Sequence, residues 1–191
     1  MMALNGDSVN SIMVKRYASP CGVLLLGSVG NELCLCDWAE RKHRKCVDRK
    51  LMSALKTEYR EGTSDVIALA IAEINAYFAG TLREFSVPIR QVGTEFQLRV
   101  WRQLQQIPYG TTTSYSKIAE NIGKPRAVRA VANAIGANPI SIIVPCHRVV
   151  GADHSLTGYA GGITAKRTLL QIEGGEIAEV AYRKINGAPT C

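Results

Sequence analysis

The spacing of apolar residues changes near residue 90, and this change constrains the fold of the chain more than any other feature. Before it, short apolar-rich segments at 11–18, 22–29 and 32–38 are separated by Ser19-Pro20 and Gly30-Asn31. Short apolar segments divided by turn-forming residues are typical of strands joined by hairpins. We therefore predict an antiparallel meander at the start of the chain.

The remainder of the first half adds helical signals to this meander. Residues 37–56 are strongly charged and predict a loop or an exposed helix. Ser64 can cap a helix that runs to about Ala79, because apolar residues recur there at helical spacing. A short strand is expected at 85–88. No residues in this half converge on a reaction, so we interpret residues 1–90 as a structural α/β domain.

After residue 90 the apolar residues recur at helical spacing in three consecutive segments. The first begins after Thr94, which can cap it, and ends at Pro108-Tyr109-Gly110. The second begins near Tyr115 and is ended by Gly123-Lys124-Pro125, and the third stops before Gly136. Two short amphipathic helices around a Gly-containing turn predict a helix-turn-helix. Paired short helices also occur in proteins that bind no DNA, so this pattern leaves the function open.

The outward face of the third segment favours contact with DNA that is independent of sequence. This face carries Arg126, Arg129, Ala130, Asn133 and Ala137. Recognition helices that read a sequence present several long polar side chains to the base edges, whereas small residues allow close backbone approach and carry little base information. A protein that acts on damage at arbitrary positions would need such a face.

The charge distribution supports a polyanionic partner. Residues 1–90 contain twelve Lys or Arg and ten Asp or Glu, a balance of +2. Residues 96–167 contain nine Lys or Arg and only Glu120 and Asp153 as carboxylates, a balance of +7. A basic segment nearly free of carboxylates is the footprint expected of a protein that binds the phosphate backbone. A solvated basic face without a partner is the alternative.

A cysteine and a histidine stand side by side at the end of an apolar run. Residues 142–150 are mostly β-branched and predict a buried strand or extended segment, which Pro145 stops. Cys146 is therefore expected on a rigid turn beside His147. A thiol is a strong nucleophile only as the thiolate, and a neighbouring histidine favours that form at neutral pH. A buried structural cysteine beside a hydrogen-bonded histidine is the alternative for an isolated pair.

The other cysteines do not suggest a disulfide framework or a metal site. The six cysteines show no framework spacing, so we expect free thiols; they are Cys21, Cys34, Cys36, Cys46, Cys146 and Cys191. The group Cys34, Cys36, His43 and Cys46 matches no common structural-zinc spacing. We expect core cysteines and an exposed histidine there, and no metal ligands.

The N-terminal residues and the lengths of the apolar runs predict where in the cell the protein is found. Residues 1–10 show no basic segment followed by an apolar one, so no secretory signal is expected. No apolar run approaches the ~18–20 residues that a membrane span needs. We expect a cytoplasmic, monomeric protein.

The segment Pro145-Cys146-His147-Arg148-Val149 resembles the active-site signature of the O6-alkylguanine-DNA alkyltransferases, also called methylated-DNA–protein-cysteine methyltransferases. The resemblance extends from about Gly93 to Gly174. The other matching segments are Gly93-Thr94-Glu95-Phe96, Ile107-Pro108-Tyr109-Gly110, Arg129-Ala130-Val131, Asn138-Pro139, Tyr159-Ala160-Gly161-Gly162, and Leu169-Leu170 with Glu173-Gly174. Residues 19–22 and 77–80 carry a weaker match in the first half.

The resemblance implies a fold of the α+β (α/β) class. An N-terminal ribonuclease H-like α/β domain with a short antiparallel sheet would occupy residues 1–90. A helical, winged-helix-like domain that binds DNA and accepts the alkyl group would occupy residues 91–178, followed by a tail at 179–191.

The resemblance also implies a reaction. An alkylated guanine in double-stranded DNA is flipped out of the duplex, and its alkyl group moves from O6 to Cys146. Alkylated thymine, at O4, is a second candidate substrate. The thioether is not reversed, so each molecule acts once and needs no cofactor.

Family roles carry over to individual positions. His147 would act through a bound water as the base that deprotonates Cys146, and Glu173 would orient His147. Tyr159 would donate a proton toward the departing guanine, and Asn138 would tie the recognition helix to the cysteine loop. These roles suit a reaction that needs a soft nucleophile and a proton for its leaving group.

Further roles concern the DNA. Arg129 would enter the base stack in place of the extruded base, and Tyr115 would push the adjacent phosphate around. The remaining expected DNA contacts are Ser116, Arg126, Ala127 and Asn133. The expected lining of the substrate pocket is Ile135, Val149 and Ala160. Arg148 is expected to make a structural salt bridge or a hydrogen bond to nearby backbone.

Two departures within the family bear on the alternatives. Some members bind zinc in the N-terminal strands, and no complete ligand set aligns here. Members with tryptophan in place of the acceptor cysteine bind lesions without repairing them, whereas this chain retains Cys146. A non-catalytic lesion-binding module and a winged-helix regulator of a defined operator remain the alternatives.

Overall fold

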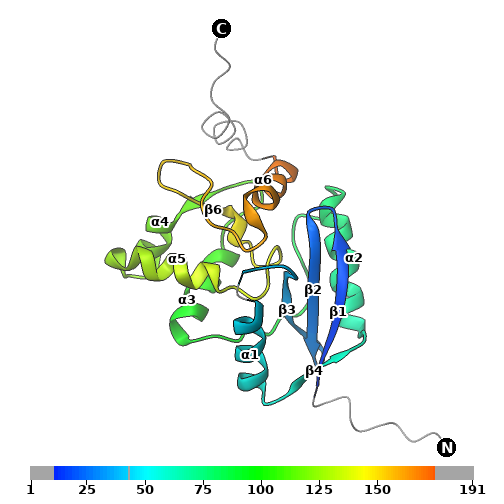
Figure 1. Ribbon diagram of the computed structural model, residues 1–191. Helices are drawn as coiled ribbons and strands as arrows, with labels where there is room; N and C mark the ends of the chain where they lie inside the picture. The colour runs from blue at the N-terminus through cyan, green and yellow to red at the C-terminus, as the bar shows by residue number, and fades with distance from the viewer. Residues whose placement is uncertain (1–10, 43, 175–191) are drawn as a thin grey trace, which may run out of the picture. The chain divides into compact units, whose positions relative to one another are not determined.

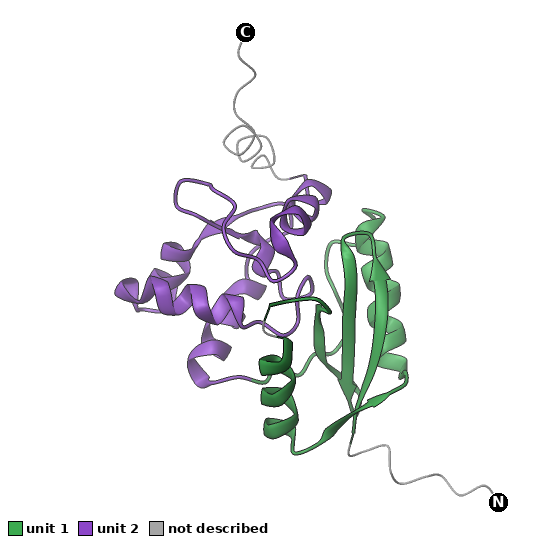
Figure 2. Ribbon diagram, viewed as in Figure 1, with its two compact units in different colours: residues 1–92 green, residues 93–191 purple. Residues whose placement is uncertain are grey.

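The computed structural model describes residues 11–42 and 44–174. The chain divides into two compact units, residues 1–92 and 93–191 (Figure 2). The tail expected at 179–191, together with His43 and Cys191, lies outside the described residues. Within the described ranges, no helix is long and apolar enough to cross a membrane.

Unit 1 is built on a four-stranded sheet (Figure 1). Strands β1 (Ser11–Ser19), β2 (Gly22–Val29) and β3 (Glu32–Trp38) form an antiparallel meander, as predicted. Strand β4 (Glu58–Glu61) adds to β1 in parallel and gives the order β3-β2-β1-β4. The short, charged β4 carries little apolar pattern, which is why the sequence did not indicate it.

Two helices belong to unit 1. Helix α2 (Asp65–Phe78) begins at the predicted cap, where the Ser64 hydroxyl accepts a hydrogen bond from the Ile67 amide at 3.3 Å. It buries Ile74 and other apolar residues in the core. The charged stretch after β3 forms helix α1 (Arg44–Leu55), so the helical alternative was correct.

The strand expected at 85–88 is absent, because a buried carboxylate takes its backbone donors. Glu73 accepts hydrogen bonds from the amides of Ser86, at 3.0 Å, and Val87, at 3.1 Å. The segment is irregular and has only an isolated bridge at Ile89 within the described residues. A side chain from α2 therefore replaces the strand ladder that the apolar residues suggested.

Unit 2 is mainly helical and contains the helices predicted for the second half. Its elements are α3 (Glu95–Gln105), β5 (Thr113–Ser114), α4 (Tyr115–Asn121), the short 3-10 helix η2 (Pro125–Ala127), α5 (Val128–Gly136), the 3-10 turn η3 (Cys146–Arg148), β6 (Val149–Val150) and α6 (Gly162–Ile172). Helix α3 opens with a capping box between Thr94 and Gln97. Strands β5 and β6 pair in parallel.

A buried tryptophan joins two of these helices. Trp101 of α3 is 1% exposed, and its indole N–H donates to the Ala134 carbonyl of α5 at 2.8 Å. A Cβ at Gly93 would lie only 2.6 Å from the Trp101 ring, so a side chain there would displace the ring. The packing of α5 on α3 therefore also depends on the absence of a side chain at Gly93, just before the cap of α3.

The apolar run before the cysteine is a turn, and the predicted strand over 142–144 is wrong. Ile142 has φ of +72°, outside the extended region, and the Val144 amide donates to the Ile140 carbonyl at 3.0 Å. Extended structure is limited to β6, after η3. The Asn138 side chain accounts for this turn, because its oxygen accepts from Ile140 N and its nitrogen donates to Val144 O.

Candidate active site

The centre of the site in unit 2 is the buried carboxylate of Glu173, the C-cap residue that directly follows α6. Its Oε1 lies 2.8 Å from Nε2 of His147 and 3.0 Å from Nη2 of Arg148. Its Oε2 accepts from Nε of Arg148 at 2.9 Å and from the Gly110 amide at 3.1 Å. A carboxylate has about four lone-pair directions, so these four donors satisfy it.

These contacts determine the protonation states of Glu173 and His147. Burial alone would raise the pKa of Glu173. The hydrogen bonds from His147 and Arg148, the charge of Arg148 and the charge that His147 carries once it is protonated at low pH lower that pKa to about 2. Burial lowers the pKa of His147 below its usual 6.5, although the contact with Glu173 opposes the shift. At neutral pH we therefore take Glu173 as ionised, held by Arg148, and His147 as neutral.

The tautomer of His147 follows from this contact. A neutral imidazole has one N–H, and the ionised Glu173 requires a donor at Nε2. Nδ1 then carries a lone pair, and it is buried without a hydrogen-bond partner among the described residues. A buried acceptor of this kind is suited to receive a proton.

The sulfur of Cys146 lies next to His147 in the chain and is held by Asn138. The Asn138 amide nitrogen is 3.3 Å from Sγ and 3.0 Å from the Val144 carbonyl. Cys146 is 6% exposed and Asn138 is 2% exposed. An amide donor aimed at the sulfur stabilises its ionised form. Because Asn138 follows α5, it connects that helix to the cysteine turn.

The loop 107–110 is part of the site, which sequence reasoning missed. The Ile107 carbonyl accepts from Nη1 of Arg148 at 2.6 Å, and the Tyr109 hydroxyl donates to the Ile172 carbonyl at 3.1 Å. The Arg148 guanidinium lies 5.7 Å from the centre of the Tyr109 ring. Gly110 has φ of +75°, and a Cβ there would lie 2.8 Å from the Glu173 carbonyl oxygen. From the sequence, these four residues were identified only as a segment that resembles the family, with no role in the site.

Arg148 makes both of the contacts expected of it, a salt bridge and a hydrogen bond to backbone. Its salt-bridge partner is Glu173 itself, with the two side chains 8% and 0% exposed. The prediction of a structural role is confirmed. The sequence did not indicate that this role is to neutralise the carboxylate that contacts His147.

Tyr159 lies near the histidine. Its ring centre is 6.5 Å from that of His147, with the rings at 78°. Tyr159 and Ala160 are half-buried in the segment before α6. The Tyr115 hydroxyl is 3.4 Å from the Thr157 carbonyl of the same segment.

A buried lysine also holds that segment, and the sequence reasoning did not identify it. Lys166 of α6 is fully buried, and its Nζ donates to the carbonyls of Val149, at 2.6 Å, and Thr157, at 2.8 Å. Burial lowers the pKa of Lys166 to about 8. Its position beside Ala165, Leu169 and Leu170 on the apolar side of α6 is a signal that could have found it.

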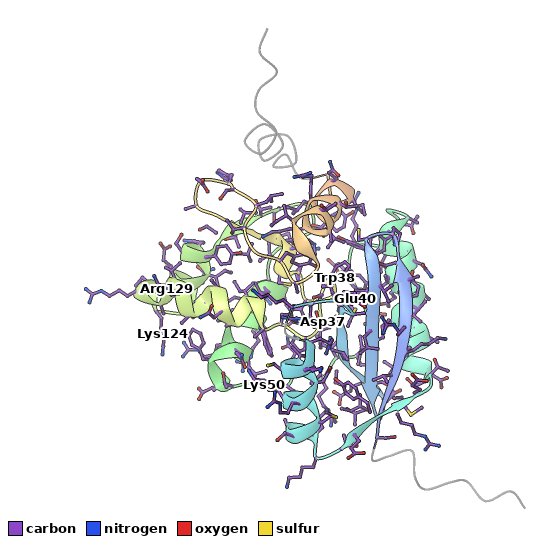
Figure 3. The ribbon with its side chains drawn as sticks, viewed as in Figure 1. Asp37, Trp38, Glu40, Lys50, Lys124 and Arg129 are labelled. Atoms are coloured by element: carbon purple, nitrogen blue, oxygen red, sulfur yellow. The ribbon has the colours of Figure 1, made fainter. Side chains whose placement is uncertain are left out.

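The predicted DNA contacts belong to η2, α5 and the start of α4. Arg126 and Ala127 belong to η2, and Arg129 and Asn133 lie four residues apart on one face of α5. The two arginines and Asn133 are exposed, and Arg129 projects away from α5 (Figure 3). The remaining two, Tyr115 and Ser116, are half-buried at the start of α4, where the Ser114 and Ser116 hydroxyls are 2.8 Å apart.

The three residues expected to line a substrate pocket differ in exposure. Ile135 near the end of α5 is 6% exposed, Val149 is fully buried in β6, and Ala160 is half-buried. Val149 directly follows η3, which carries the cysteine.

The core placement predicted for the cysteines between residues 34 and 46 is confirmed for Cys34 and Cys36 and is wrong for Cys46. Cys34 and Cys36 are fully buried in β3, and Cys46 is exposed on α1. Burial raises the pKa of the Cys34 thiol to about 12. No group of three or more possible metal ligands occurs within residues 11–42 and 44–174.

Comparison with known proteins gives the family. Residues 95–175 match the family model described as the DNA-binding domain of 6-O-methylguanine DNA methyltransferase. A methylated-DNA–protein-cysteine methyltransferase of Mycobacterium tuberculosis is 60% identical over 104 residues, which are 54% of this chain and 63% of that protein. One from Methanosarcina barkeri is 43% identical over 155 residues, which are 81% of this chain and 92% of that protein.

Solved structures agree over most of the chain. The crystal structure of M. tuberculosis OGT in complex with DNA has a TM-score of 0.72 and 45% identity, and the match covers 84% of this chain and 92% of that one. The O6-methylguanine-DNA methyltransferase of Pyrococcus kodakaraensis has a TM-score of 0.62 at 25% identity, with 85% and 99% covered. Both the sequence and the mixed α+β fold therefore place the chain in the methylated-DNA–protein-cysteine methyltransferase family.

Proposed function

We propose that this protein repairs alkylated DNA by transferring an alkyl group from O6 of guanine to its own Cys146, once per molecule. The observation that carries the proposal is the buried cysteine held by Asn138 beside a neutral histidine, whose Nε2 is fixed by an ionised glutamate. This is the logic of an activated nucleophile, in which a base is oriented by a third group. Family membership supports the same reaction.

The proposed reaction begins with removal of the thiol proton. His147 takes this proton at Nδ1, through a bound water as in the family resemblance, and Glu173 stabilises the charge that develops on the ring. The sulfur then attacks the alkyl carbon. A C–S bond forms and the C–O6 bond breaks, and the electron pair of that bond stays with the guanine.

The leaving guanine then needs a proton. Tyr159, whose ring lies near His147, is the proposed donor. Asn138 directs one amide hydrogen at the sulfur and so favours the thiolate over the thiol before attack. Arg148 keeps Glu173 ionised throughout but does not contact the reacting atoms in this scheme.

Duplex DNA carrying alkylated guanine is the proposed substrate, and unit 2 the proposed domain that binds it. Helices α4 and α5 would act as a helix-turn-helix in a winged-helix-like arrangement, with unit 1 as a ribonuclease H-like domain. The exposed cations of η2 and α5 would contact phosphates, while Arg129 fills the space left by the flipped base. Tyr115 and Ser116 at the start of α4, with Ala127 and Asn133, complete the proposed contact surface. Ile135, Val149 and Ala160 would line the pocket for the flipped base.

Transfer of label tests the proposal. Protein is incubated with duplex DNA labelled in the methyl group of one O6-methylguanine, and the adduct is located by peptide mass spectrometry. We expect one label per molecule on Cys146, and loss of transfer in Cys146→Ser with DNA binding largely retained, because an alcohol is far less ionised than a thiol. Cys46→Ser, at an exposed cysteine of unit 1, is the control and should keep full transfer.

Other results would favour the alternatives. Binding to lesions without label on the protein would identify a lesion-binding module. A preference of ~10³ or more for one undamaged duplex over scrambled ones would identify a regulator. Label on a residue other than Cys146 would mean that the nucleophile is misassigned.

A further inference from the structure

The outward side of α1 in unit 1 carries positive charge that the proposed reaction does not use. Residues 40–56 contain seven Lys or Arg and two carboxylates. Lys45, Arg49 and Lys50 of α1 are exposed, and we call them the α1 cation face. Figure 3 labels Lys50 on this helix.

The orientation of α1 follows from its apolar residues. Val47, Leu51 and Leu55 pack into the core cluster that includes Ile12 and Leu35 of the sheet. Residues on the opposite side of a helix with this apolar stripe must face away from the core. Apart from the α1 cation face, that opposite side holds small residues, namely Cys46, Ser53 and Ala54, and all three are exposed.

The carboxylates near the helix are already engaged. Asp48 accepts from Nη2 of Arg44 at 2.6 Å and from the Tyr59 hydroxyl at 2.8 Å. The fully buried Asp37 pairs with Arg41 at 2.6 Å and with Arg44 at 3.0 Å.

The third nearby carboxylate, Glu40, pairs with Arg16 at 3.2 Å. Within the described part of the chain, Lys45, Arg49 and Lys50 therefore have no carboxylate partner.

This arrangement is unfavourable for an isolated helix. Lys45 and Arg49 are four residues apart, and like charges at this spacing repel each other. Lys45 also lies in the first turn, which has no acidic residue, where the helix dipole disfavours a cation. An ordinary solvated helix face mixes both signs of charge. A face of one sign, with small residues between the cations, complements a polyanion that can approach closely.

We propose that the α1 cation face is a second contact for the phosphate backbone of duplex DNA, separate from the helices of unit 2. The proposal rests on the proposed function, which brings duplex DNA to this chain. DNA is the occupant favoured by charge, because its phosphates form a regular row of negative charges and need no base contact. Asp37 pairs with Arg44 at the start of α1 and with Arg41 before the helix, and these contacts hold the face in a defined place on unit 1.

Neutralising two charges tests the contact. The variant Lys45→Gln/Arg49→Gln is compared with Lys15→Gln/Arg60→Gln, which removes the same charge from exposed positions on β1 and β4. Affinity for a long undamaged duplex is measured between low and moderate salt. Each lost phosphate contact lowers the slope of log K against log salt by about 0.9, so the α1 variant should lose about 2 in slope. If its affinity equals that of the wild type near ~1 M salt, it should bind roughly 60-fold more weakly near ~0.1 M salt.

The outcomes separate this proposal from the proposed function. We expect the control pair to change the affinity and the slope much less than the α1 variant, and both variants to transfer alkyl groups from a free alkylated base at the wild-type rate. An equal loss of DNA affinity in the two double variants, or no loss in the α1 variant, would overturn the second contact. Normal alkyl transfer by the wild type would still support the proposed function in that case. Circular dichroism of each variant establishes that α1 remains folded. Absence of DNA binding and transfer in the wild type would instead contradict the proposed function.

Discussion

At the scale of single residues, the charge of Glu173 organises the site. Four donors from His147, Arg148 and Gly110 converge on its two oxygens. The side chain of Glu173 is fully buried in the salt bridge with Arg148. Removal of the negative charge therefore leaves a buried guanidinium without its partner, which costs more than the loss of a surface ion pair.

Glu173→Gln is expected to lower both stability and transfer. The amide cannot accept all four hydrogen bonds, and the charge that fixes Arg148 is lost, so the free energy of unfolding should fall by about 3 kcal/mol. Chemical denaturation measures this change. Glu120→Gln breaks an exposed pair with Lys117 and should change stability by less than about 1 kcal/mol. Equal effects of the two substitutions would contradict the central role of Glu173.

The pH dependence of transfer should report His147. Because burial lowers the pKa of His147 from its usual 6.5, the base is still neutral at that pH, and the rate should fall only at lower pH. His147→Ala should move the rising limb of the rate profile to higher pH, since the sulfur then loses its base. The rate of transfer from a free alkylated guanine base, measured across pH, tests this expectation. A profile unchanged in the variant would exclude His147 as the base.

At the scale of elements, the two sides of α5 have different roles, one in packing and one in the proposed contact with DNA. Its inner side packs through Val131 and Ala134 on unit 2, and the chain after its end continues into Asn138 and the cysteine turn. Its outer side presents Arg129 to solvent. If DNA contacts this outer side as proposed, α5 and the hydrogen bond from Asn138 to Sγ of Cys146 connect that contact to the reactive sulfur.

Arg129→Ala should slow repair of duplex DNA by roughly ten- to a hundredfold. Flipping a base costs a few kcal/mol, and the arginine is proposed to offset part of that cost by filling the stack. Transfer from a free alkylated base needs no flipping and should be unchanged. Arg102→Ala, at an exposed arginine of α3, is the control for loss of charge. If both substrates slow equally in the Arg129 variant, its flipping role is excluded.

At the scale of the whole molecule, stability should depend on pH through Glu173. Its pKa is about 2 in the folded protein against an ordinary 4.5, so between these values the unfolded chain binds more protons. The stabilisation is fully present above about 4.5 and is lost as the pH falls toward 2. This shift corresponds to about 3 kcal/mol.

Thermal unfolding across this pH range measures the effect. The wild type should lose stability steeply on acidification, whereas Glu173→Gln should show a flatter profile because it lacks the titrating group. Parallel profiles for the two proteins would mean that other groups govern the acid transition.

Local rules of sequence and turn chemistry were sufficient for most helices and for the meander. Ser64 and Thr94 cap α2 and α3 where expected, because capping depends on residues three positions apart. The same rules failed at 142–144 and at 85–88. In both segments a buried side chain from outside the segment, Asn138 or Glu73, takes backbone hydrogen bonds that a strand would have used.

The sequence by itself indicated the family and predicted the nucleophile and its neighbouring base, because these depend on which residues are adjacent in the chain. Only the tertiary structure showed that Arg148, Gly110 and Glu173 meet, and that Lys166 is buried between two carbonyls. Those contacts join residues more than eight positions apart. They exist because folding places unlike charges and hydrogen-bonding groups together in a dry interior, where each must find a partner.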